Sequence, residues 1–121
     1  MKKHILIVDD EAVIRELLTE FLTFNQYRVT AVASAMEAKE TVRTDVPDLV
    51  ISDLQLEDSD GLEMIEQLKT AHKDLPVILL TGVLFDPHVI QGAISKKVSS
   101  YLPKTSPLAQ VLAEVKRLVG G

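Results

Sequence analysis

The chain has 121 residues, of which 46% are hydrophobic and 26% charged, with a net charge of −5 and no cysteine. The length predicts one domain over residues 1–121, and the lack of cysteine excludes disulfides, thiolate metal sites and thiol nucleophiles. The acidic balance argues against direct nucleic-acid contact, and the absence of an apolar stretch near the roughly 18 residues of a membrane helix predicts a cytoplasmic protein without membrane contact.

Five strand candidates, most of them short continuous apolar runs, alternate with segments of helical periodicity along the chain. The runs cover residues 4–8, 27–32, 48–52, 77–81 and 99–102. Continuous apolar runs of this length are typical of strands buried on both faces of a parallel sheet. They could also be pieces of buried helix, so the segments between them decide the interpretation.

The intervening segments have the start signals and apolar stripes of helices. Four of the starts are marked by a capping box or by a capping residue before proline, at Ser34 with Glu37, Asp60 with Glu63, Asp86-Pro87 and Ser106-Pro107. The first helix, expected at about 11–24, has an apolar stripe formed by Val13, Ile14, Leu17, Leu18, Phe21 and Leu22. Five strands and five helices in alternation predict an α/β fold, a doubly wound parallel sheet with right-handed crossovers.

Polar residues directly follow or end four of the five apolar runs. Asp9 and Asp10 follow the first run, Asp53 the third, and Lys104 the last, while Thr81 ends the fourth. In an open parallel sheet, ligands bind outside the carboxyl ends of the strands. We therefore expect three carboxylates, a hydroxyl and an ammonium group to meet at one edge of the sheet.

Each of these residues also has a structural explanation when taken alone. Asp10 could cap the first helix, and aspartate after a strand is common in turns. Together, however, three crowded carboxylates stay ionised only if a cation neutralises them, and all-oxygen ligands favour Mg²⁺. Lys104 and the Thr81 hydroxyl suit the oxygens of a phosphoryl group, so the set predicts attack of a carboxylate on phosphorus.

With these residues in this order, the chain resembles the receiver domain of two-component response regulators. The resemblance covers essentially the whole chain, and its matching residues are Asp9-Asp10, Asp53 followed by Gly61, Thr81, Tyr101 and Lys104. It implies a flavodoxin-like (βα)5 sandwich with strand order 2-1-3-4-5. It also implies a phosphorylation-controlled switch that promotes only its own phosphorylation and dephosphorylation and is not an enzyme for an outside substrate.

The resemblance implies a role for each acidic residue. Asp53 would accept a phosphoryl group from a sensor histidine kinase or a histidine phosphotransfer protein. Asp10, Asp53 and the backbone carbonyl of Gln55 would bind Mg²⁺ directly, and Asp9 would bind it through water.

The resemblance assigns the remaining residues to readout. Lys104 would pair with the phosphoryl group, Thr81 would move toward it, and Tyr101 would rotate inward. A downstream effector domain or protein would then bind the face formed by the fourth helix, fifth strand and fifth helix, and this face would also allow a homodimer.

The sequence departs from the family pattern in three places. Thr105 replaces the proline that usually follows the lysine in a cis peptide bond, which would be costly before a residue other than proline. Glu57 replaces a second usual proline, and Lys96-Lys97-Val98 replace a turn of small residues. These departures leave open whether Lys104 occupies its usual place.

Three alternatives to a working receiver remain. A phosphatase with an aspartyl nucleophile would need a second aspartate where this chain has Gln55. A flavin-binding module would need a phosphate loop rich in Ser, Thr and Gly, where Asp9-Asp10-Glu11 would repel the flavin phosphate. A degenerate receiver that docks without being phosphorylated is disfavoured by the complete acidic and basic set, although Thr105 keeps it open.

Overall fold

Five parallel strands form one sheet with the order β2-β1-β3-β4-β5. The structure is a computed structural model that describes residues 2–54, 56–58, 60–81 and 98–120, without the side chain of Thr81. The strands are β1 (His4–Val8), β2 (Arg28–Val32), β3 (Leu49–Asp53), β4 (Val77–Thr81) and β5 (Ser100–Pro103). The predicted doubly wound sheet and its strand order are confirmed, with every strand boundary within one residue of its prediction.

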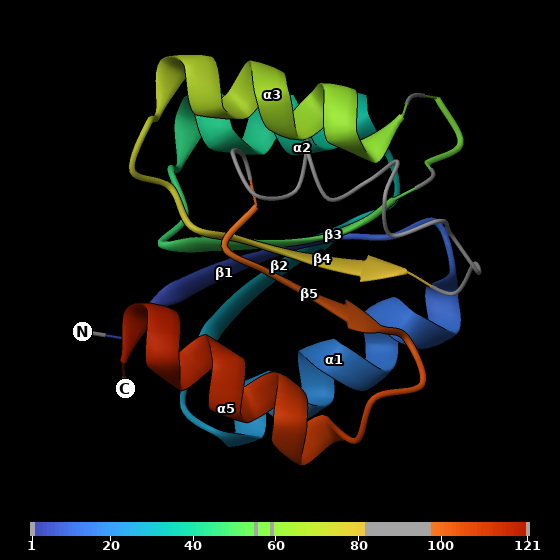
Figure 1. Cartoon of the computed structure of the whole chain (residues 1–121), viewed down its shortest axis with the longest axis vertical. Helices are drawn as coiled ribbons and strands as arrows, with labels where there is room; N and C mark the ends of the chain where they lie inside the picture. The colour runs from blue at the N-terminus through green and yellow to red at the C-terminus, as the bar shows by residue number, and fades with distance from the viewer. Residues whose placement is uncertain (1, 55, 59, 82–97, 121) are drawn as a thin grey trace.

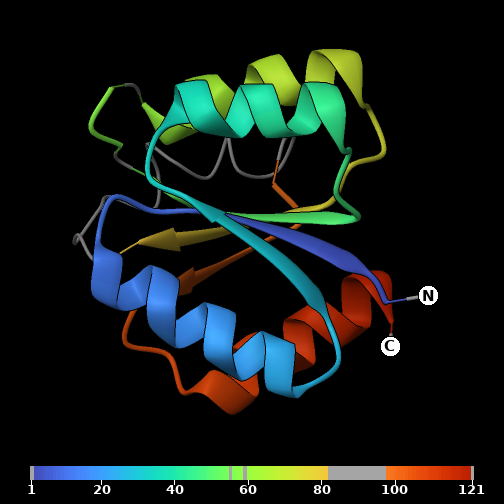
Figure 2. The same ribbon diagram turned by 180° about the vertical axis from the view of Figure 1, so that it is seen from behind.

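Helices cover both faces of the sheet. Helices α2 (Ala35–Thr44) and α3 (Gly61–Ala71) lie on one face, and α1 (Ala12–Phe24) and α5 (Leu108–Val119) lie on the other (Figures 1 and 2). The predicted fourth helix, starting at Asp86-Pro87, falls outside the described residues. None of the described helices is long and apolar enough to cross a membrane.

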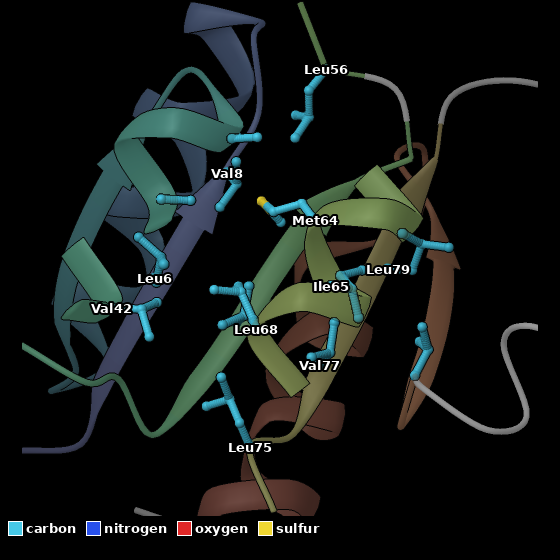
Figure 3. Close-up of a cluster of buried hydrophobic side chains, with 14 residues drawn as sticks. Leu6, Val8, Val42, Leu56, Met64, Ile65, Leu68, Leu75, Val77 and Leu79 are labelled. Atoms are coloured by element: carbon cyan, nitrogen blue, oxygen red, sulfur yellow. The ribbon is translucent and has the colours of Figure 1, made fainter. Parts of the chain in front are cut away.

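The strand residues divide between two cores because successive side chains point to opposite faces of a strand. Leu6, Val8 and Val50 belong to the core beneath α2 and α3, whereas Ile5 and Ile7 belong to the core beneath α1 and α5. Figure 3 shows the first core, where helical side chains meet those of the sheet. The strands β1 and β3 are therefore buried on both faces, which explains their continuous apolar runs, whereas the edge strands β2 and β5 are partly exposed.

Several predicted details of the helices are wrong or incomplete. In α1, Val13 is 73% and Leu17 45% exposed, because the apolar stripe is wider than the face that contacts the sheet. Helix α5 begins at Leu108 with Pro107 as its N-cap and no side-chain cap. The predicted cap at Ser106 was therefore one residue early.

The start of α2 has a cap that the sequence did not predict. Ser34 Oγ accepts the amide of Glu37, as expected, while its hydroxyl hydrogen-bonds the Glu37 carboxylate. The first two amides of the helix are taken by Asp58, from the loop after β3, whose two carboxylate oxygens accept from Ala35 N at 2.9 Å and Met36 N at 3.1 Å. The loop after β3 is thus hydrogen-bonded to α2, the helix that packs beside α3 on the same face of the sheet.

The strand register brings the carboxyl ends of β1, β3, β4 and β5 into line. Val8 pairs with Ser52, Asp53 with Leu80, and Thr81 with Pro103. Residues that follow these strands consequently emerge at one edge of the sheet, although they are far apart in sequence.

Candidate functional site

Lys104 lies between two buried carboxylates at the carboxyl edge of the sheet. Its Nζ is 3.0 Å from Asp53 Oδ2 and 3.0 Å from Asp9 Oδ2, and it is 3.3 Å from Glu11 Oε1. Asp9 is 1% and Asp53 7% exposed, whereas Asp10 is exposed. Ends of three strands therefore supply one compact ionic cluster.

Three contacts hold Asp9 in this cluster. Its backbone N–H donates to Val32 O at 3.1 Å, and its Oδ1 accepts the Glu11 amide at 2.8 Å. The guanidinium of Arg15 donates to its backbone carbonyl oxygen at 2.7 Å. Glu11, rather than Asp10, is the N-cap of α1, so the explanation of Asp10 as a helix cap is wrong.

The pKa values of both Lys104 and Asp9 are raised, which favours the charged form of the lysine and the neutral form of the aspartate. Burial alone lowers the pKa of the Lys104 ammonium, but the hydrogen bonds to Asp53 and Asp9 outweigh it and hold the net pKa above its ordinary value. Burial raises the pKa of the Asp9 carboxyl, although the Glu11 amide and Lys104 oppose this effect. At neutral pH, Lys104 is therefore firmly charged, whereas Asp9 is ionised at a cost.

Thr105 follows Lys104 in place of the usual proline, and the Lys104 ammonium lies between Asp9 and Asp53. The described part of the chain contains no cis peptide bond, so the bond from Lys104 to Thr105 is trans. The ammonium group still reaches Asp53 and Asp9. A trans bond after Lys104 is therefore compatible with both contacts.

The acidic residues have a composition and spacing that suit a divalent cation. Asp9, Asp10 and Asp53 each offer a carboxylate oxygen, and these oxygens lie within 4.8 Å of one another. Asp9 Oδ2 is buried and close to Lys104, but it receives no hydrogen bond of good geometry among the described residues. Three carboxylates against one ammonium leave an excess of negative charge, so the site fits a hard cation bound by oxygen.

Some predicted site residues cannot be placed. Gln55 and the side chain of Thr81 lie outside the described residues, as do Lys96 and Lys97. Tyr101 is on β5 and is 45% exposed.

Two residues that shape the site, Glu11 and Arg15, were not predicted from the sequence, and Gly61 was named only as part of the family pattern. A Cβ at Gly61 would lie 2.1 Å from the carbonyl oxygen of Asp53, so only glycine allows α3 to begin this close to the end of β3. Glu11 and Arg15 both contact the cluster. Their positions at the start and on the first turn of α1 were the only signal in the sequence.

The 2-1-3-4-5 sheet defines a doubly wound α/β protein, and the carboxylates and lysine at its carboxyl edge form an acidic site that fits a divalent cation. The chain belongs to the response regulator receiver domain family, whose model matches residues 5–116. It is thus the receiver domain of a two-component response regulator.

Individual relatives support this assignment. The response regulators MprA of Mycobacterium ulcerans (strain Agy99) and Mycobacterium leprae (strain TN) are 33% and 34% identical, over 98% and 96% of this chain and 51% and 50% of theirs. The chain therefore spans about half the length of these curated relatives.

Solved structures agree in fold. A CheY-like response regulator receiver domain protein from Methanospirillum hungatei JF-1 aligns with a TM-score of 0.89 and 25% identity, over 97% of this chain and 93% of that one. NtrX from Brucella abortus aligns with a TM-score of 0.89 and 26% identity, over 98% of this chain and 27% of its own.

Proposed function

We propose that this chain is a phosphorylation-controlled switch in which Asp53 accepts a phosphoryl group from a phosphohistidine. The observation that carries the proposal is the 3.0 Å contact between Lys104 Nζ and Asp53 Oδ2 at the carboxyl edge of the sheet. A carboxylate that attacks phosphorus needs a fixed positive charge beside it, because the transferring group carries negative charge on its oxygens. The donor would be a sensor histidine kinase or a histidine phosphotransfer protein.

The other acidic residues would bind the cation that this reaction requires. Asp10, Asp53 and the backbone carbonyl of Gln55 would hold Mg²⁺ directly, with Asp9 bound to it through water. Mg²⁺ supplies positive charge that neutralises the phosphoryl oxygens. The close approach of the three carboxylate oxygens supports this assignment.

Lys104 would exchange partners when Asp53 is phosphorylated. In the unmodified protein its ammonium neutralises the carboxylates of Asp53 and Asp9. A phosphoryl group on Asp53 would present oxygens of greater negative charge to the same ammonium. Because the Lys104 ammonium would bind the phosphoryl oxygens more strongly than the carboxylates, phosphorylation would shift the protein toward a second conformation.

The second conformation would be read through Thr81 and Tyr101. Thr81 would approach the phosphoryl group and Tyr101 would turn inward, changing the face formed by the fourth helix, β5 and α5. A downstream effector domain or protein, or a second copy of the chain, would bind this face. The protein would act on no outside substrate.

Two broader expectations belong to the same proposal. Residues 1–121 would form one receiver domain. The protein would work in the cytoplasm, where its phosphodonors obtain their phosphoryl groups from ATP. We expect no direct contact with nucleic acid, because the net charge is −5. We also expect no contact with a membrane.

The proposal is tested by the mass of the intact protein after incubation with acetyl phosphate and Mg²⁺. We expect the gain of one phosphoryl group, which is lost in Asp53→Asn and when EDTA removes Mg²⁺. A phosphoryl group that persists in Asp53→Asn would refute the choice of acceptor. No gain with acetyl phosphate or with a panel of purified phosphohistidine donors would favour a receiver that docks without being phosphorylated.

A further inference from the structure

Arg15 contacts the loop that carries Asp9 and Asp10 from the first turn of α1. Its backbone amide donates to Glu11 O at 3.1 Å, so the start of the helix fixes its position. From there its guanidinium reaches back and donates to the carbonyl oxygen of Asp9 at 2.7 Å. The side chain is partly buried, and it closes the turn between β1 and α1 with a charge-assisted hydrogen bond.

The carbonyl that Arg15 holds belongs to the peptide unit joining Asp9 to Asp10. Because a peptide unit is planar, fixing its oxygen also fixes the direction in which the next Cα lies. The Asp9 side of this unit is already held through Val32 and through the Glu11 amide. Arg15 therefore acts on the part of the loop that determines where the Asp10 side chain begins.

Asp10 is the member of the carboxylate cluster with the least support of its own. Asp9 and Asp53 are buried and both contact Lys104, whereas Asp10 is exposed. A metal ligand needs a defined position, and partners that hold ligands from behind contribute strongly to metal affinity. Arg15 can provide this support, because it holds the carbonyl oxygen of the peptide unit that precedes Asp10.

We propose that Arg15 is a positioning residue, which sets the Mg²⁺ affinity of the acidic cluster by holding the Asp9–Asp10 peptide unit. This inference rests on the proposed function, because it takes Asp10 as a Mg²⁺ ligand. It predicts an effect opposite in sign to simple electrostatics. A positive charge near the site repels a dication, so if charge alone mattered, removing Arg15 would tighten Mg²⁺ binding.

The test is calorimetric titration of Mg²⁺ into the wild-type chain and three variants. Arg15→Met removes both the charge and the donor but keeps an apolar stem, and we expect Mg²⁺ affinity to fall about tenfold. Arg15→Lys keeps a charge and a donor and should recover part of this loss. Arg28→Met is the matched control, because it removes a guanidinium at the opposite end of the sheet, where Arg28 pairs with Asp45. It should leave the affinity unchanged.

A second readout separates positioning from general damage to the fold. In Arg15→Met, the phosphorylation rate with acetyl phosphate should return to the wild-type value at saturating Mg²⁺, because only occupancy of the site has changed. A rate that stays low at saturation would overturn the inference, as would an Arg15→Met affinity equal to or above wild type. If circular dichroism shows that Arg15→Met is unfolded, Arg15→Lys becomes the test. A Mg²⁺ affinity of Arg15→Lys equal to that of the wild type then overturns the inference.

The Asp10→Asn variant distinguishes a wrong role for Arg15 from a wrong proposed function. If wild type binds no Mg²⁺, or if Asp10→Asn binds it equally well, the proposed ligand set is wrong and the role of Arg15 falls with it. If Asp10→Asn loses affinity while Arg15→Met does not, only the role of Arg15 is wrong.

Discussion

Lys104 Nζ lies 3.0 Å from Asp53 Oδ2, joining the end of β5 to the end of β3 across β4. The same ammonium contacts Asp9 at the end of β1. One positive charge therefore neutralises carboxylates from two other strands. The stability of the metal-free protein should depend on it.

Replacing Lys104 with methionine should have opposite effects on folding and on metal binding. Without Mg²⁺, the free energy of unfolding should fall by about 3 kcal/mol, because two buried carboxylates lose their partner. Mg²⁺ should bind more tightly, since a competing cation has left the site. Urea unfolding in EDTA and calorimetric titration measure the two effects. Lys116→Met, at an exposed position on α5, is the control that should change neither.

Replacing Asp9 with asparagine should stabilise the metal-free protein. Burial raises the pKa of the Asp9 carboxyl in the folded state, so its ionised form opposes folding at neutral pH. The folded state then binds the proton more readily than the unfolded state. Stability is therefore lost as pH rises from the ordinary pKa of 3.8 through the folded value.

The gain in Asp9→Asn should amount to a few degrees in melting temperature at pH 7 and should shrink as the pH is lowered toward 4. Thermal unfolding across this pH range measures it. Glu57→Gln removes one charge at an exposed position and should not reproduce the gain. An Asp9→Asn variant less stable than wild type at pH 7 would show that the contact with Lys104 outweighs burial.

His4 should make the protein sensitive to mild acid. It is 2% exposed, and its Nε2 is hydrogen-bonded to Thr30 Oγ1 at 2.8 Å. Burial and the nearby Arg28 charge lower the pKa of its ring, while Asp45 and Asp48 oppose this effect. The unfolded state therefore takes up the proton first, and stability falls as pH drops from the ordinary pKa of 6.5 through the folded value.

Substitution of His4 by glutamine should remove this component of the pH dependence while keeping a partner for Thr30. Unfolding free energies measured between pH 7.5 and about 5 provide the test, since an ordinary histidine titrates in this range. His72→Gln, at the end of α3, should leave the slope in place. An unchanged slope in His4→Gln would assign the pH dependence to other groups.

Asp58→Ala should weaken the start of α2. Its carboxylate accepts the amides of Ala35 and Met36, which lowers the pKa of the Asp58 carboxyl. We expect a lower melting temperature and faster hydrogen exchange at these two amides, because they lose their acceptor. Glu57→Ala, at the preceding exposed position, is the control. Equal exchange at Ala35 and Met36 in both variants would contradict the cap.

The sequence predicted the inner strands β1 and β3 well because a strand that is buried on both faces is apolar at every position. Each run such as Ile5 to Val8 shows it directly, and the residues that follow the runs are therefore predictable at one edge. It predicted the helix faces less well. Val13 and Leu17 are apolar but exposed, since periodicity does not determine how wide a face the neighbouring layer covers.

The sequence by itself determined the alternation of strands and helices and the chemical groups at the carboxyl edge of the sheet. Only the tertiary structure decided that Lys104 bridges Asp9 and Asp53, that Arg15 holds the Asp9 carbonyl, and that Asp58 caps α2. The physical reason is the sequence distance over which the interactions act. Secondary structure follows from neighbours within a few residues, whereas the partner of a charged or capping side chain is set by strand register and by the layers packed on the sheet.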